Sequence, residues 1–282
     1  MTEFGLLTQF RYHLKTMSND PFAQMKAAQR EGWAFFAPLE WLTTPAAFKL
    51  VRFAGVQTGQ RVLDVGCGTG VVAVTAARLG ATVTGLDLTP TLLEKARQNA
   101  EIAGLSIEFH EGDIEALPFK DATFDMVLSQ FGHIFAPRPS IAVGEMLRVL
   151  RPGGRIAFST WPPELVVGKM FALTASYLPP PPEGAAPPTQ WGNPEIVRER
   201  LSNRVTDVSF ERDAIYMPGL SPEHIIGTFE RTGGPLIKLV ESLKNDPARL
   251  KQFRSEFRAI VEEYYRENQL HQSYLMTRAR KR

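Results

Sequence analysis

The chain has 282 residues, of which 44% are hydrophobic and 22% charged, a composition typical of a globular protein with one large domain or one domain and a smaller cap. Its formal net charge of +2 is too small to indicate a polyanionic partner, and its one cysteine, Cys67, excludes an intrachain disulfide and a cysteine-rich zinc site. The sequence shows no basic-then-apolar leader and no run of about eighteen apolar residues, so we expect a cytoplasmic chain without a membrane span.

The N-terminal part of the chain is predicted to be helical. Residues 1–16 are interpreted as a loosely attached extension, because polar residues follow them. From Pro21 to about Ala54 apolar residues recur at helical spacing, and Pro38 and Pro45 are expected to break this stretch into short helices. We therefore assign residues 1–56 to an N-terminal helical segment.

Strand-like and helix-like runs alternate in the middle of the chain. The expected strands are residues 61–65, 82–86, 106–110, 124–129 and 155–160, and the helices between them are residues 71–79, 90–103 and 140–150. Pro90 at the first helical position and Gly104 just past the end mark the second helix. This alternation predicts an α/β fold with a doubly wound, mostly parallel sheet that helices cover on both faces.

The pattern changes after residue 160. Residues 161–189 are rich in proline, which favours loops and polyproline II over helix. Residues 204–217 are predicted to form one or two strands, residues 221–268 helices, and residues 271–277 a last strand. The basic residues that follow are interpreted as a solvated tail, namely Arg278, Arg280, Lys281 and Arg282.

The predicted helical block before the last strand divides the sheet domain in sequence. We assign residues 57–217 and 269–282 to the sheet domain and residues 218–268 to a helical cap. Open parallel sheets bind ligands beyond the carboxyl ends of their strands. The cap is therefore expected to lie over that edge, where a ligand would bind.

The first predicted strand leads into an acidic, glycine-rich loop, Asp64-Val65-Gly66-Cys67-Gly68-Thr69-Gly70. Alternate glycines allow a sharp turn and a close approach to a ligand, and the following helix N-terminus supplies amide donors. Val71 occupies the place of the third glycine of a dinucleotide fingerprint, and a carboxylate suits an ammonium group better than a pyrophosphate. The loop is predicted to bind a ligand of that kind; a tight turn without function is the alternative.

Two more acidic residues follow later strands. Asp87, followed by Leu88, lies about twenty residues beyond the glycines, where a carboxylate can accept both hydroxyls of a ribose. Asp113 follows the third strand, where it could accept from an adenine amine while Ile114 flanks the base. The alternatives are an N-cap or turn for Asp87 and a turn acid after Gly112 for Asp113.

These motifs together resemble those of the class I S-adenosylmethionine-dependent methyltransferases. The resemblance rests on residues 62–70, 85–87, 112–119, 124–127 and 147–154, and it covers about residues 59–161. It is strongest to the small-molecule branch that includes the ubiquinone and menaquinone C-methyltransferases. It implies S-adenosylmethionine as cofactor and a seven-stranded Rossmann-like sheet whose last strand is antiparallel.

The resemblance also implies roles for single residues. Asp64 and the backbone from Gly66 to Gly70, including Cys67 and Gly68, would hold the methionine moiety, Asp87 with Leu88 the ribose, and Asp113 with Ile114 the adenine. The loop after the fourth strand, with Gln130 and His133, should face the sulfonium and the acceptor. Trp33 would close over the methionine end, as the helix before the first strand often does in relatives.

His133 is the candidate catalytic base. Methyl transfer from a sulfonium needs mainly positioning and dehydration, and a base is required only when the acceptor carries a proton. The unperturbed pKa of a histidine lies close to neutral, which suits that role. A packed or solvated loop histidine is an equally good interpretation. No pair of histidines at i, i+4 spacing indicates a metal.

The acceptor is predicted to be a small molecule. The segments expected to wall its pocket are rich in aromatic residues, which favours an apolar or aromatic acceptor methylated on carbon or oxygen. No basic stripe indicates nucleic acid, and the chain is expected to be a monomer or homodimer. A protein or RNA methyltransferase and a non-catalytic S-adenosylmethionine-binding protein remain the alternatives.

Overall fold

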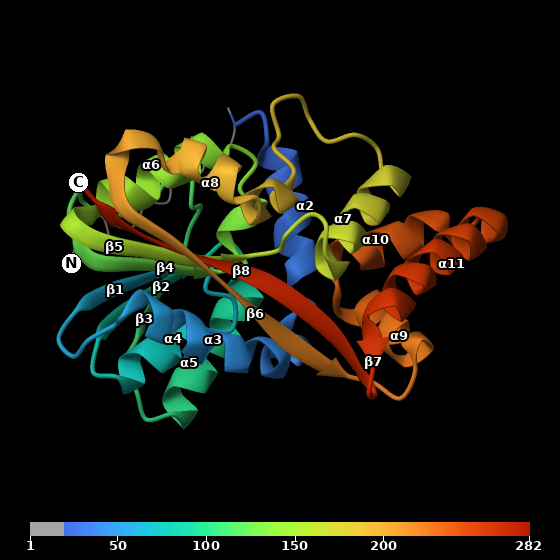
Figure 1. Cartoon of the computed structure of the whole chain (residues 1–282), viewed down its shortest axis with the longest axis horizontal. Coiled ribbons are helices and arrows are strands. Elements are labelled where there is room, and N and C mark those ends of the chain that lie inside the picture. Colours follow the sequence, from blue (N-terminus) through green and yellow to red (C-terminus); the bar gives the residue numbers. More distant parts are fainter. Residues whose placement is uncertain (1–19) are drawn as a thin grey trace, which may run out of the picture.

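A twisted central sheet runs through the molecule, with helices on both of its faces (Figure 1). The computed structural model describes residues 20–282. The strands are β1 (Arg61–Val65), β2 (Thr82–Asp87), β3 (Glu108–Glu111), β4 (Phe124–Gln130), β5 (Leu150–Thr160), β6 (Val205–Pro218), β7 (Tyr265–Arg266) and β8 (Gln269–Lys281). Their order is β3-β2-β1-β4-β5-β8-β6, and the short β7 pairs only with β8.

Strands β1 to β5 are parallel, and β8 pairs antiparallel with both β5 and β6. The predicted doubly wound, mostly parallel sheet with an antiparallel last strand is therefore confirmed. On one side of β1 the sheet continues with β2 and then β3, and on the other side with β4 and then β5. The strand order therefore reverses between β1 and β4. Ligands of such sheets bind at this reversal, beyond the carboxyl ends of the strands.

The helices form two layers and a separate group. Figure 1 shows α3, α4 and α5 on one face of the sheet and α6 and α8 on the other, while α2, α7, α9, α10 and α11 lie beyond the carboxyl edge. Their bounds are α2 (Ala23–Trp33), α3 (Glu40–Ala54), α4 (Val71–Arg78), α5 (Pro90–Ile102), α6 (Pro139–Val149), α7 (Val166–Tyr177), α8 (Pro194–Leu201), α9 (Pro222–Thr232), α10 (Gly234–Leu243) and α11 (Pro247–Tyr264). Short 3-10 turns join some of them, at Ala37–Leu39, His133–Phe135, Pro188–Gly192 and Ser202–Arg204.

The central strands are apolar on both faces because helices cover both. Val62 and Leu63 of β1 and Met126, Val127 and Leu128 of β4 are all fully buried. Burial of such side chains contributes roughly 1.5–3 kcal/mol each, which holds these two strands in the core. The ends of β1 and β4, where the candidate site begins, are therefore anchored in the buried core of the sheet.

The first proline prediction is wrong at Pro45, which lies inside α3 and does not end it. A proline there removes one backbone hydrogen bond. The helix continues because its inner face is packed, with Ala46, Ala47, Leu50 and Val51 buried against the sheet. Tertiary packing outweighs the local preference of the proline.

The prediction of loops over residues 161–189 is also wrong in part, since α7 (Val166–Tyr177) is a regular helix. Prolines flank this helix at Pro162, Pro163 and Pro179 but do not occur within it. Val166 and Met170 are buried on its inner face. The prolines mark the ends of the helix, and composition averaged over the whole stretch concealed it.

The basic residues after residue 277 do not form a solvated tail. β8 continues through Lys281, where the Arg278 guanidinium lies 4.9 Å from the centre of the Phe53 ring and donates to the Phe53 carbonyl at 2.8 Å. Lys281 Nζ donates to the carbonyl of Leu150 at 2.6 Å. The predicted extension at residues 1–16 lies outside the described residues. No helix within residues 20–282 is long and apolar enough to cross a membrane.

Candidate cofactor and acceptor site

The loop after β1 turns on three glycines. Gly66, Gly68 and Gly70 have φ angles of 62°, 53° and 80°, in the left-handed region that other residues rarely adopt. A Cβ built at Gly66 would lie 2.8 Å from the Cα of Gly132, so the loops after β1 and β4 are in direct backbone contact. This contact places the end of β4 against the glycine loop.

Asp64 lies at the end of β1 with only 1% of its surface exposed. Its Oδ2 accepts a hydrogen bond from the backbone amide of Ala73, 3.0 Å away in the first turn of α4, whereas its buried Oδ1 has no partner. Burial, with a smaller contribution from the charge of Asp87, raises the pKa of Asp64 well above its usual value. A cationic group at Oδ1 would offset this desolvation, so the carboxyl suits a ligand with an ammonium group.

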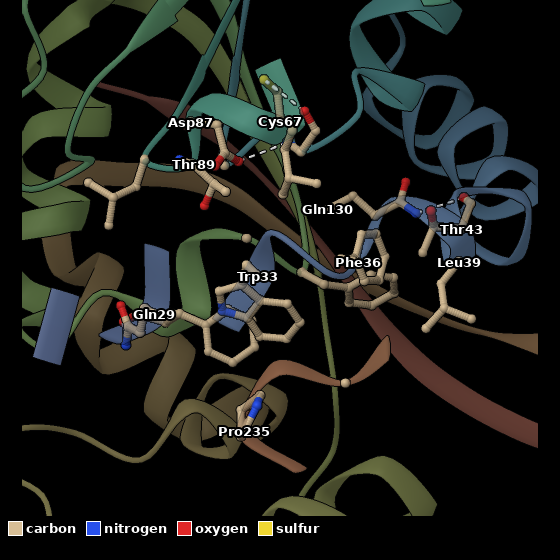
Figure 2. Close-up of a pocket in the computed structure, with 18 of the residues that line it drawn as sticks. Gln29, Trp33, Phe36, Leu39, Thr43, Cys67, Asp87, Thr89, Gln130 and Pro235 are labelled. Atoms are coloured by element: carbon tan, nitrogen blue, oxygen red, sulfur yellow. Dashed lines mark hydrogen bonds between the residues drawn. The ribbon is translucent and has the colours of Figure 1, made fainter. Parts of the chain in front are cut away.

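Gln130 provides a second free acceptor at the end of β4. Its Nε2 donates to the carbonyl of Thr43 in α3 at 2.8 Å, a hydrogen bond drawn in Figure 2. This bond leaves Oε1 buried without a partner. Asp64 Oδ1 and Gln130 Oε1 therefore both offer lone pairs to a ligand beside the glycine loop.

Asp87 is held by two backbone amides at the end of β2. Its Oδ2 accepts from Gly68 and its Oδ1 from Thr89, both at 2.8 Å, so the carboxylate joins the glycine loop to the start of α5. Burial raises the pKa of Asp87, although these amide hydrogen bonds act in the opposite direction. Each carboxylate oxygen keeps a free lone pair, and the amide hydrogen bonds fix both oxygens in position before a diol binds.

Asp113 follows β3 and bonds to a residue that sequence analysis did not identify, Lys26 of α2. Lys26 Nζ lies 2.7 Å from Asp113 Oδ2 and 2.6 Å from Glu115 Oε2, and it also pairs with Asp20. Lys26 is only 4% exposed. Burial alone would lower the pKa of Lys26, but its hydrogen bonds to the three carboxylates raise it, so the ammonium stays charged.

The three carboxylates around Lys26 have a spacing that a divalent cation could use. Oxygen atoms of Asp20, Asp113 and Glu115 all lie within 4.8 Å of one another. Lys26 Nζ donates to all three. The ammonium of Lys26 and the guanidinium of Arg138, which pairs with Asp20 and Glu115, thus supply the positive charge of the cluster, and Lys26 ties α2 to the loop after β3.

One cavity of about 270 Å³ joins these loops to the helices beyond the sheet. At one end it is lined by the predicted cofactor residues Trp33, Asp64, Gly66, Cys67, Gly68, Asp87, Leu88, Asp113, Ile114 and Gln130. Gly70 does not line it; a Cβ there would meet Ala96 of α5 at 3.1 Å, so this glycine serves helix packing. The other end is lined by apolar residues of β6, α7, α9, α10 and α11, including Ile215, Met170, Phe171, Phe229, Leu236 and Phe257.

Aromatic rings form part of the cavity wall. Trp33 packs against Phe36, with ring centres 6.0 Å apart, and against Phe135 at 4.6 Å; Figure 2 shows Trp33 beside Phe36. Phe131 stacks on Trp161 with ring centres 4.0 Å apart and planes 10° from parallel. Phe131 has a φ of 60°, which is strained for a bulky residue. Such strain at a cavity wall is typical of a functional position, and the sequence alone did not reveal it.

The structure is at odds with a catalytic role for His133. The ring is completely buried, lies 4.6 Å from Phe158 and 4.7 Å from Trp191 between ring centres, and does not line the cavity. Burial, assisted by the charge of Arg200, lowers the pKa of His133 to about 3. The loop after β4 turns this side chain into the core, so it cannot reach an acceptor from this position.

Comparisons with known proteins agree with this geometry. Residues 63–158 match a family model described as a methyltransferase domain. The chain is 35% identical over 256 residues to the uncharacterized protein Rv1403c of Mycobacterium tuberculosis, which covers 89% of this chain and 93% of that protein. It is 39% identical over 132 residues to the demethylmenaquinone methyltransferase of Thermus thermophilus, which covers 46% of this chain and 58% of that enzyme.

The solved structure of YcgJ from Bacillus subtilis shares the fold. It aligns with a TM-score of 0.57 and 18% identity over 84% of this chain and 98% of that one. The segment that matches the family model contains the glycine loop, Asp87, Asp113 and Gln130. The resemblance found in the sequence is therefore confirmed, and S-adenosylmethionine is the cofactor. The chain belongs to the class I S-adenosylmethionine-dependent methyltransferases.

Proposed function

We propose that this enzyme methylates a small apolar or aromatic molecule on carbon or oxygen. The observation that carries the proposal is the cavity that runs from the cofactor loops to apolar residues of α7, α9, α10 and α11. Small-molecule sites are concave and mostly apolar, with a few polar groups that fix orientation. We assign residues 218–268, which contain α9 to α11, as the cap over the acceptor.

We further propose how the cofactor is held. S-adenosylmethionine supplies an electrophilic methyl group on a sulfonium that is already a good leaving group. Asp64 Oδ1 and Gln130 Oε1, both without a partner, would accept from its ammonium group. The backbone of Gly66, Cys67 and Gly68 would lie along its methionine moiety.

The remaining cofactor contacts follow from the other loops. Asp87 would accept the ribose hydroxyls and Leu88 would pack beside them. Asp113 and Ile114 would contact the adenine, and Trp33 would shield the methionine end from water. All of these residues line the same cavity.

The charges are distributed unevenly along the cavity. Its ionisable lining residues are Lys26, Arg30, Asp64, Cys67, Asp87 and Asp113, all from α2 or the strand loops at the cofactor end. Among the described residues, those that α7, α9, α10, α11, β6 and β8 contribute to the lining are not ionisable. These residues offer no general base, so we infer that the acceptor loses its proton without one. The enzyme would then act by positioning and dehydrating the acceptor, which can supply much of the acceleration.

The proposal is tested by methyl transfer from labelled S-adenosylmethionine to a panel of phenols and enolisable ketones. The full chain is expected to release S-adenosylhomocysteine with some of them. Leu236→Trp, which fills the apolar end, should abolish turnover while S-adenosylhomocysteine still binds. Leu220→Trp is the control, because Leu220 is 83% exposed. Incorporation of the label into protein or RNA alone would contradict a small-molecule acceptor.

A further inference from the structure

Gln272 is a buried polar residue on the wall of the acceptor end. Its side chain belongs to β8, it is 3% exposed, and it lines the cavity together with Ile215, its partner across the β6–β8 pair. Its Nε2 is buried and has no hydrogen-bond partner. A buried donor without a partner costs stability, so its retention on a cavity wall calls for a functional reason.

Other polar side chains on the cavity wall already donate to the protein. Gln29, Thr43 and Thr174 each donate to a backbone carbonyl, at 3.0, 3.1 and 2.8 Å. These bonds use the hydroxyl donors of Thr43 and Thr174, whereas the amide of Gln29, on α2, keeps a second N–H. Among the described residues that α7, α9, α10, α11, β6 and β8 contribute to the lining, Gln272 is the one with a buried side-chain donor that has no partner.

The chemistry of a free amide donor specifies its partner. An N–H group needs a lone pair, and an apolar molecule most commonly provides one on a carbonyl, hydroxyl or phenolate oxygen. The stacked rings of Phe131 and Trp161 line the same cavity and offer flat apolar surface. The wall therefore combines one hydrogen-bond donor with surfaces that suit a planar ring.

We propose that Gln272 binds the methyl acceptor by donating a hydrogen bond to an oxygen on an otherwise apolar, planar molecule. This inference rests on the proposed function and narrows its substrate class to oxygenated aromatic or alicyclic compounds. The hydrogen bond orients the acceptor in a chamber whose other contacts are apolar and therefore weakly directional.

The test compares two probes that differ by one oxygen, 1-tetralone and tetralin. Both are titrated calorimetrically into the full chain saturated with S-adenosylhomocysteine. 1-Tetralone should bind about 5-fold more tightly than tetralin, the effect of one net hydrogen bond. In Gln272→Met, which keeps the length of the side chain and removes the amide, the two probes should bind equally.

The matched control is Thr174→Val, because the Thr174 hydroxyl lines the same cavity but already donates to the carbonyl of Met170. This variant should keep the preference for 1-tetralone. The melting temperature of the free protein gives a second readout. It should rise in Gln272→Met, since an unsatisfied donor is removed, whereas loss of a structural glutamine would lower it.

The possible failures are distinguishable. An unchanged preference for 1-tetralone in Gln272→Met, or a lowered melting temperature, would overturn the role of Gln272 and leave the small-molecule function standing. If neither probe binds to the protein loaded with S-adenosylhomocysteine, both the apolar acceptor chamber and the role of Gln272 are refuted.

Discussion

Buried polar atoms without partners divide into two groups in this protein. Asp64 Oδ1, Gln130 Oε1 and Gln272 Nε2 belong to residues that line the cavity, where a ligand can satisfy them. Both ring nitrogens of His133 also lack partners, but this residue lies in the core. The atoms of the first group are therefore available to a ligand, whereas the unpartnered nitrogens of His133 affect the stability of the fold.

His133 should make the fold sensitive to acid. Its folded pKa of about 3 lies below the unfolded value of 6.5, so the unfolded chain takes up the proton first as the pH falls. The stability that the neutral His133 contributes is fully present above pH 6.5 and is lost as the pH falls toward 3. Between pH 7.5 and 5.5 this loss should be about 1.4 kcal/mol, measured by urea unfolding.

The His133→Leu variant should lose this dependence on pH. His110→Gln is the matched control, because His110 lies on β3 with 44% of its side chain exposed. It should retain the slope of the natural protein. If His133→Leu still loses the same stability between pH 7.5 and 5.5, the acid sensitivity has another source.

Local motifs revealed some site residues, and distant contacts hid the others. Asp64 and Asp87 could be predicted because each lies at a strand end with a fixed spacing to the glycines. Lys26 could not, since its partner Asp113 is 87 residues away in the chain. Gln272 lies on a strand whose polar and apolar residues alternate as in any half-buried strand, so its sequence does not mark it. The orientation of His133 depends on how the loop after β4 turns, which no local motif predicts.

At the scale of elements, two turns meet at the glycine loop. Gly66→Ala would place a Cβ at a φ of 62° and 2.8 Å from Gly132, whereas Gly68→Ala meets no atom within 4 Å at a φ of 53°. Both variants should lose about 1–2 kcal/mol from the left-handed backbone. Gly66→Ala should lose a further ~1–3 kcal/mol from the collision and should bind S-adenosylhomocysteine more weakly.

Thermal unfolding and calorimetry of the two alanine variants measure this difference directly. The Gly68 variant serves as the control for backbone strain alone. Equal losses of stability in both variants would mean that the loops after β1 and β4 separate easily. The close contact between them would then not be needed to shape the cofactor end.

Lys26 fastens α2 to the loop after β3. Lys26→Met should lower the free energy of unfolding by about 3 kcal/mol at pH 8, because a buried ammonium that pairs with three carboxylates is removed. Asp20 and Glu115 keep their ion pairs with Arg138 in this variant, so the loss falls mainly on Asp113 and on the attachment of α2.

Lys244→Met is the control for Lys26→Met. Lys244 pairs with Glu241 on the surface, where its side chain is 58% exposed, and such pairs contribute less than about 1 kcal/mol. Chemical denaturation at pH 8 compares the two variants. A loss in Lys26→Met as small as that in Lys244→Met would show that α2 is held by its apolar contacts.

Elements with a clear period could be predicted, and those decided by packing could not. The strands and helices from residue 61 to residue 149 follow local patterns closely. Pro45 stays in a helix because the inner face of α3 is buried, which local preference cannot show. The α7 helix was missed because prolines on both sides dominate the composition of the stretch that contains it.

At the scale of the whole molecule, one cavity is shared by three parts of the chain. The strand loops, α2 and the helices beyond the sheet edge all contribute lining residues. Gly32 of α2 and Gly234 of α10 approach closely, since a Cβ on Gly234 would lie 2.7 Å from the Gly32 carbonyl group. These two helices therefore join directly where they enclose the cavity.

S-adenosylhomocysteine should protect more than the loops that bind it. Because α2 and α10 enclose the same cavity and touch each other, the ligand should slow amide hydrogen exchange in both. α8 does not line the cavity and should exchange at an unchanged rate. Hydrogen exchange measured by mass spectrometry tests this, and protection confined to the loops after β1, β2 and β3 would contradict it.

The position of β8 in the sheet has a consequence for how the protein is made. β8 lies between β5 and β6 but follows both in the chain. During synthesis on the ribosome, β5 and β6 emerge first, each with an open edge where β8 will later insert. The nascent chain must hold these edges apart from other strands while α9, α10 and α11 are translated. Closure of the sheet is therefore a late, long-range step, and chaperones that shield open strand edges should increase the yield of folded enzyme.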